Sequence, residues 1–69
     1  MRLSARNQIK GTVKAVTKGA TTSHISVDIG GGNTVMASIT NEAVDELGIK
    51  SGSKVTVVIK ASNVMIAVD

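Results

Sequence analysis

The stretch HISVDIGGGNTVMASIT, residues 24–40, decides the fold. Its first six residues alternate, so that Ile25, Val27 and Ile29 share one face of an extended chain, and its last seven alternate in the same way. The GGGN at residues 30–33 is typical of a tight hairpin turn, because glycine readily adopts the positive φ angles that such turns need. Two alternating runs joined by such a turn predict an antiparallel β-hairpin.

Three further segments outside this hairpin carry the same period of two. Residues 2–16 predict a long first strand, bent by a bulge at Gly11. Residues 54–61, KVTVVIKA, and residues 64–69, VMIAVD, predict the last two strands, which are joined near residues 62–63. The hairpin and these segments together give five strands.

The segment TNEAVDELGIKSG after the hairpin breaks this period. Val44 and Leu47 lie three positions apart, a spacing that places both on one face of a helix. Thr40 or Asn41 can cap the start of this helix, and Gly48 fits the position just after its last turn. We therefore expect a short helix between the third and fourth strands. The predicted fold is all-β, a small five-stranded OB-like barrel with one short helix, formed by a single domain over residues 1–69.

The chain has 69 residues, no cysteine and one histidine. A chain this short buries a thin core, and such domains are usually reinforced by disulfides, a metal or oligomerisation. Disulfides and thiolate metal sites need cysteine, so we expect no metal held by direct side-chain ligation, and oligomerisation remains. Met36, Val58, Met65 and Ala67 fall opposite the expected core face, which predicts an interface between copies unless bulges shift the alternation.

The balance of charge is basic, with eight Lys and Arg against five Asp and Glu. A net charge of +3 favours an anionic partner. The complete lack of aromatic residues argues against a nucleic-acid-binding OB module, since such barrels stack bases on aromatic rings. No apolar run approaches the roughly 20 residues of a membrane helix, and no signal-peptide pattern opens the chain. We expect a cytoplasmic protein with no nucleic-acid or membrane partner.

One set of residues offers hydrogen-bond donors without a general base. The first and last strands of a closed barrel are often neighbours, and the third strand leads into the helix start. The set is Ser4, Ala5, Arg6, Thr40, Lys60 and Ser62. Hydroxyls, a guanidinium, an ammonium and backbone N–H groups suit an oxyanion, and the lack of carboxylate or imidazole argues against catalysis. The alternative is a structural assembly protein, in which these groups pair with carboxylates across an interface.

Three segments resemble one known family. They are SARNQIKGTV at residues 4–13, ITNEAVDELGIKSGSKV at 39–55 and VIKASNVMIAV at 58–68. Together they are similar to the molbindins, the molybdenum-pterin-binding proteins with a Mop domain, over nearly the whole chain and in one copy. The resemblance implies an OB-like barrel and a hexamer built as a trimer of dimers. It also implies storage or homeostasis of molybdate or tungstate, bound at subunit interfaces, with no organic cofactor and no enzymatic activity.

The resemblance also assigns roles to particular residues. Ser4, Arg6 and Lys60, with the backbone of Ala5, match the main oxyanion site of the family. Thr40 matches a hydroxyl at the helix start. A second family hydroxyl falls at Ala43, so that donor is missing or is replaced by a backbone N–H or by Ser62. A second anion site near a threefold axis is expected in the loop of residues 18–24. Its candidates are Lys18, Gly19, Ser23 and His24.

Overall fold

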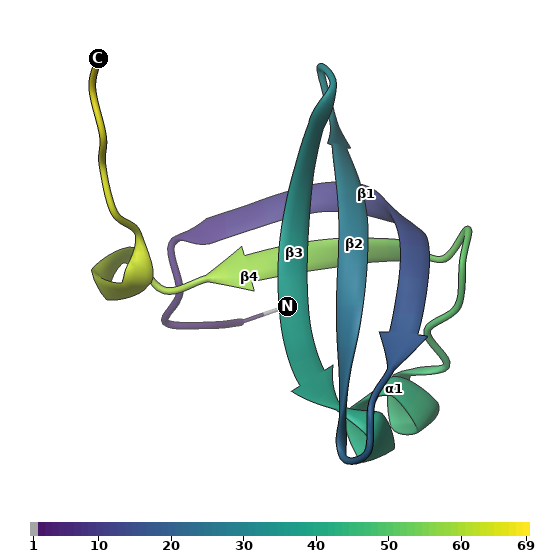
Figure 1. Ribbon diagram of the computed structural model, residues 1–69. Coiled ribbons are helices and arrows are strands. Elements are labelled where there is room, and N and C mark those ends of the chain that lie inside the picture. The colour runs from purple at the N-terminus through teal and green to yellow at the C-terminus, as the bar shows by residue number, and fades with distance from the viewer. Residues whose placement is uncertain (1) are drawn as a thin grey trace.

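The computed structural model describes residues 2–69, and within them it contains four strands, one α-helix and one 3₁₀ turn. In chain order these are β1 Asn7–Lys18, β2 Thr22–Gly30, β3 Asn33–Thr40, α1 Asn41–Leu47, β4 Lys54–Ile59 and η1 Ala61–Asn63. The strands form one antiparallel, curled sheet in the order β3-β2-β1-β4, with α1 at one end (Figure 1). The prediction of an all-β fold with one short helix is confirmed.

The β2–β3 hairpin follows its sequence closely. Strand β2 ends at Gly30 and β3 begins at Asn33, and Gly30, Gly31 and Gly32 all have positive φ. The N–H of Gly30 donates to Oδ1 of Asp28 at 2.8 Å, which fixes the start of the turn. The alternating register places Val27 opposite Val35.

Helix α1 begins and ends where its capping residues predict. Oγ1 of Thr40 accepts the N–H of Ala43 at 3.1 Å, and Gly48 adopts the left-handed conformation after the last turn. Val44 is buried in the core, whereas Leu47 on the same helix is 70% exposed.

Strand β1 departs from its prediction in two ways. It begins at Asn7 rather than residue 2, and its register shift against β2 lies between Val13 and Ala15 rather than at Gly11. Gly11 has a different role, because a Cβ there would come within 2.6 Å of Cγ1 of Val27. The glycine allows β1 and β2 to approach closely where the sheet curls.

The core is thin, as the length of the chain predicts. Its buried hydrophobic residues are Val13, Ile25, Val27 and Val44. Seven partly buried hydrophobic residues pack around this cluster, among them Ala37 and Val57 from the two edge strands. No aromatic side chain is available to enlarge the cluster.

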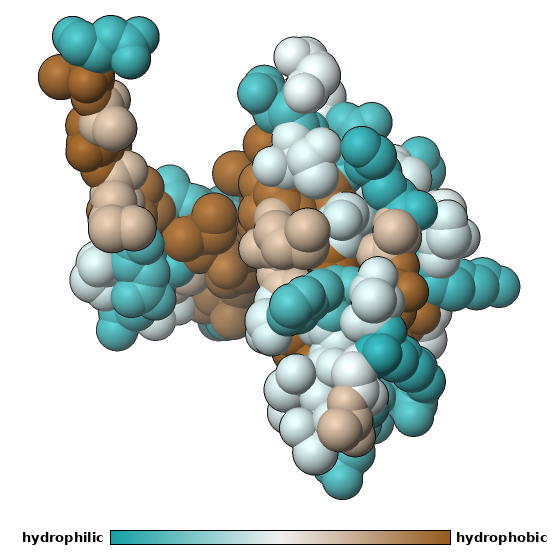
Figure 2. Space-filling model, in the orientation of Figure 1, coloured by the Kyte–Doolittle hydropathy of each residue, from teal (hydrophilic) through white to brown (hydrophobic). Residues whose placement is uncertain are grey.

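The expected fifth strand is absent from the sheet, so the prediction of a five-stranded barrel is wrong for the described residues 2–69. After η1 the chain runs out as a C-terminal tail, residues 64–69, without a strand assignment (Figure 1). Met65 is 92% exposed and Ile66 86% exposed. Figure 2 shows hydrophobic atoms along this projecting tail. The side chains of residues 64–69 follow the alternating pattern of a strand, but within one chain no edge of the sheet lies beside these residues.

Candidate functional site

Antiparallel pairing of β1 with β4 brings two donor-bearing segments to one end of the sheet. Asn7, the first residue of β1, is paired with Ile59, the last residue of β4. Nδ2 of Asn7 also donates to the carbonyl oxygen of Ile59 at 3.1 Å. Residues 4–6 directly precede this pair and residues 60–62 directly follow it, so the expectation that the two segments are neighbours agrees with the strand register.

The side chains of these segments are accessible. Ser4 and Arg6 lie in bends before β1, although the sequence predicted that the first strand would include them. Both are exposed, as are Lys60 and Ser62. Within residues 2–69 the single ion pair joins two other residues, which leaves the guanidinium of Arg6 and the ammonium of Lys60 available for an anion.

Thr40 lies elsewhere. It stands at the junction of β3 and α1, and β3 is the opposite edge of the sheet from β4. Figure 1 shows this junction at the bottom of the view and the end of β4 at the left. Thr40 lines a shallow depression of about 400 Å³ together with Asn41 and the acidic Glu42. One copy of the chain therefore does not bring Thr40 together with Arg6 and Lys60.

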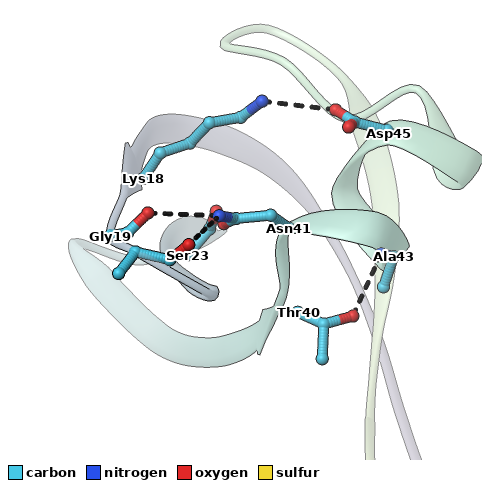
Figure 3. A network of polar contacts seen from close by, with 8 residues as sticks. Lys18, Gly19, Ser23, Thr40, Asn41, Ala43 and Asp45 are labelled. Carbon is cyan, nitrogen blue, oxygen red and sulfur yellow. Dashed lines mark hydrogen bonds and ion pairs between the residues drawn. The ribbon is translucent and has the colours of Figure 1, made fainter.

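The candidates for a second anion site are largely engaged in contacts within the chain (Figure 3). Nζ of Lys18 pairs with Oδ1 of Asp45 at 3.3 Å. Ser23 is completely buried, and its hydroxyl donates to Oδ1 of Asn41 at 2.5 Å. Including Ser23 among the anion-binding residues is a mistake, because strand alternation points its side chain inward. Lys18, Gly19 and His24 do line a common surface depression.

Asn41 has a structural role that the sequence did not predict. Its Nδ2 donates to the carbonyl oxygen of Gly19 at 3.1 Å (Figure 3) and to that of Ala20 at 3.4 Å. Its backbone N–H donates to the carbonyl oxygen of Thr21 at 2.9 Å. With the buried Ser23 hydroxyl, this side chain fastens the β1–β2 loop to the start of α1. Thr40 caps the helix, so the side-chain amide of Asn41 can make these other contacts. The sequence already indicated this, because Thr40 and Asn41 were both candidates for a cap that only one of them can fill.

The described part of the chain lacks both a cluster of metal-ligating side chains and a membrane-spanning helix. Among residues 2–69, no three His, Cys, Asp or Glu side chains are grouped so that they could hold a metal ion. In the same residues, no helix is long and apolar enough to cross a membrane.

Comparison with known proteins places this geometry in a family. Residues 3–66 match the TOBE domain. Molybdenum-pterin-binding protein 1 of Clostridium pasteurianum is 46% identical over 96% of this chain and 97% of its own length. The solved structure of MopII from the same organism superposes with a TM-score of 0.90 at 42% identity, over 97% of this chain and all of that one.

A third similar protein was solved with its ligand. It is the cytoplasmic molybdate-binding protein ModG with molybdate bound, which is 46% identical with a TM-score of 0.90. The match covers 94% of this chain and 46% of the ModG chain. These matches confirm the resemblance noted in the sequence. The chain belongs to the TOBE-domain family, as a single-module relative of the molybdenum-pterin-binding proteins.

Proposed function

We propose that this protein binds molybdate or tungstate as intact oxyanions in the cytoplasm, for storage or homeostasis, and catalyses no reaction. The observation that carries the proposal is the likeness of sequence and fold to ModG, whose structure holds molybdate. The donors at the β1–β4 end support it, because Ser4, Arg6, Lys60 and Ser62 are accessible and have no carboxylate among them.

The chemistry of such a site favours molybdate over phosphate. Molybdate at neutral pH is a dianion without protons, so it accepts hydrogen bonds and donates none. Phosphate usually carries a proton, which would face another donor in this set and cost free energy. Sulfate carries no proton, so it has to be discriminated by size, through hydrogen-bond lengths that tolerate little error. Tungstate nearly equals molybdate in size, and we expect both to bind.

We place the complete site between copies of the chain, within a hexamer built as a trimer of dimers. The separation of Thr40 from Lys60 in one copy supports this placement, since a second copy could supply the missing hydroxyl. The backbone of Ala5 completes the set. For a second anion site near the threefold axis, Lys18, Gly19 and His24 remain candidates after the exclusion of Ser23.

Native mass spectrometry tests the function directly. Spectra are recorded for the oxyanion-free protein, then with molybdate, and then with molybdate and an excess of sulfate. We expect an oligomer that takes up several molybdate ions whether or not sulfate is present. An oligomer that binds neither anion would overturn the proposal and favour the structural assembly protein, in which Arg6 and Lys60 pair with carboxylates of another copy.

A further inference from the structure

Lys18, the last residue of β1, lines a depression at the β1–β2 turn and is at the same time paired with a carboxylate outside that depression. The depression has a volume of about 310 Å³ and is lined by Thr17, Lys18, Gly19, Thr22 and His24. Nζ of Lys18 donates to Oδ1 of Asp45 at 3.3 Å, and Asp45 belongs to α1 and not to this lining (Figure 3). The helix thus holds an ammonium that also belongs to the depression.

The depression depends on Lys18 for its attraction to an anion. Among the residues that line it, Lys18 brings the only ammonium or guanidinium, Thr17 and Thr22 bring hydroxyls, and none brings a carboxylate. An ammonium and hydroxyls are hydrogen-bond donors of the kind that bind an oxyanion. Asp45 carries the same sign of charge as such an anion, so its carboxylate offsets the positive charge of Lys18 while the two groups are paired.

The β1–β2 turn does not need this ion pair to stay attached to α1. The backbone N–H of Asn41 donates to the carbonyl oxygen of Thr21 at 2.9 Å, and its Nδ2 donates to that of Gly19 at 3.1 Å. The N–H of Gly19 donates to the carbonyl oxygen of Thr22 at 2.7 Å, which closes the turn. None of these hydrogen bonds uses the ion pair. The turn therefore keeps its conformation when Lys18 releases its carboxylate.

The ion pair can also open at a small cost in free energy. The side chain of Lys18 is 54% exposed and that of Asp45 is 69% exposed. Water solvates both groups once they separate, so an exposed pair of this kind contributes little to stability. The flexible stem of Lys18 lets its ammonium move without a change in the backbone. An anion in the depression can therefore displace Asp45, and the affinity of the anion is reduced by the cost of doing so.

We propose that Asp45 is a competitor, built into the chain, for the oxyanion at the β1–β2 turn. Its carboxylate occupies the ammonium of Lys18 in the anion-free protein and lowers the affinity of this second site. The proposal rests on the proposed function, because it concerns the second oxyanion site named there. Lys18–Asp45 is the only ion pair within residues 2–69, so the donors Arg6 and Lys60 of the main site have no such competitor in their own chain.

Two neighbouring carboxylates of α1 provide matched variants. Asp45→Asn and Glu46→Gln each remove one negative charge from an exposed position of the same helix, but only Asp45 holds Lys18. Both are made in the Arg6→Ala protein, in which the main site is weakened, and are titrated with molybdate at low ionic strength by isothermal titration calorimetry. Asp45→Asn should bind roughly two- to fivefold more tightly than its parent, and Glu46→Gln should stay close to the parent. Equal affinities for the two variants, or no binding in either, would overturn the proposal.

A further variant in the same background shows whether the gain in affinity depends on Lys18. If Asp45 acts by occupying the ammonium, Asp45→Asn should bring no gain once that ammonium is absent. Lys18→Ala combined with Asp45→Asn should therefore bind molybdate no better than Lys18→Ala alone. A gain that persists without Lys18 would show that Asp45 repels the anion directly, and competition for the ammonium would then be wrong.

Two controls separate this role from a structural one and from the proposed function itself. If the ion pair only stabilised the fold, Asp45→Asn would lower the midpoint of thermal unfolding in oxyanion-free buffer and leave the affinity for molybdate unchanged. Competition predicts the opposite, a midpoint close to that of Glu46→Gln and a tighter anion. The wild-type protein tests the proposed function separately. If it binds molybdate while Asp45→Asn and Glu46→Gln behave alike, the competitor is refuted and the proposed function stands; if it binds none, the proposed function fails first.

Discussion

Arg6 and Lys60 carry the first prediction at the scale of single residues. Losing a charge-assisted hydrogen bond costs about 1.5–3 kcal/mol, so Arg6→Ala or Lys60→Ala should weaken molybdate binding roughly 10- to 100-fold by isothermal titration calorimetry. Lys50→Ala is the control, because it removes one positive charge from an exposed position between α1 and β4. Equal losses in all three variants would mean that only the overall charge attracts the anion.

Asn41 allows a second prediction at this scale, now about stability. Asn41→Ala leaves the buried hydroxyl of Ser23 without its partner and frees the carbonyl oxygens of Gly19 and Ala20. An unsatisfied buried polar group costs about 1–3 kcal/mol, and we expect a loss of that size in urea unfolding. Adding Ser23→Ala should cost less than the sum of the two single changes. Simple additivity would show that the two side chains do not act together.

At the scale of elements, Gly11 decides how closely β1 and β2 approach. A Cβ there would lie 2.6 Å from Cγ1 of Val27 and 2.7 Å from the carbonyl oxygen of Asp28. Gly11→Ala should therefore cost about 1–3 kcal/mol of unfolding free energy, through overpacking. Gly52→Ala is the comparison, since Gly52 has a φ of 92° and open space around it, and its cost is backbone strain of about 1–2 kcal/mol. Val27→Ala opens a cavity in the core and is itself destabilising. Thermal unfolding should show that Val27→Ala costs less in the Gly11→Ala background than in the wild type, and as much in the Gly52→Ala background as in the wild type.

The elements also show which parts of the fold a sequence can predict. The β2–β3 hairpin and the limits of α1 were predictable, because Gly30, Thr40 and Gly48 act through local backbone conformation. The bulge of β1 was not, since a glycine in a strand marks a close approach as readily as a register shift. The fifth strand was misplaced because alternation in residues 64–69 reports a strand-like pattern and not which sheet edge receives it.

The candidate site likewise has one part that the sequence could predict and one part that it could not. Strand neighbours predict that residues 4–6 lie beside residues 60–62, because β1 and β4 pair. In the proposed site Thr40 comes from a second copy, and the sequence of one chain does not show how two copies pack together. The alternation of β2 implies that the side chain of Ser23 is buried. The sequence did not predict this burial, because residues 18–24 were interpreted as a loop.

For the whole molecule, ligand binding should appear as added stability. A ligand that binds only the folded state stabilises it by about 2.7 kcal/mol at 100 times its dissociation constant. Molybdate and tungstate should each raise the midpoint of thermal unfolding by several degrees, and phosphate at the same concentration should not. The comparison also controls for a general effect of anions on a chain of net charge +3. A phosphate shift as large as that of molybdate would contradict selection by a donor-only site.

Assembly should govern the stability of the molecule even without ligand. Among residues 2–69 of one copy, four hydrophobic residues are buried, and a groove beside them exposes further apolar side chains to water. If a partner copy covers these apolar side chains, unfolding separates the copies, so the midpoint must rise with protein concentration. A tenfold increase favours a dimer by about 1.4 kcal/mol, which is a few degrees for a domain of this size. Differential scanning calorimetry over a hundredfold range of protein concentration should show this slope for the wild type. A wild-type midpoint independent of concentration would mean that each copy is stabilised by its own four strands alone.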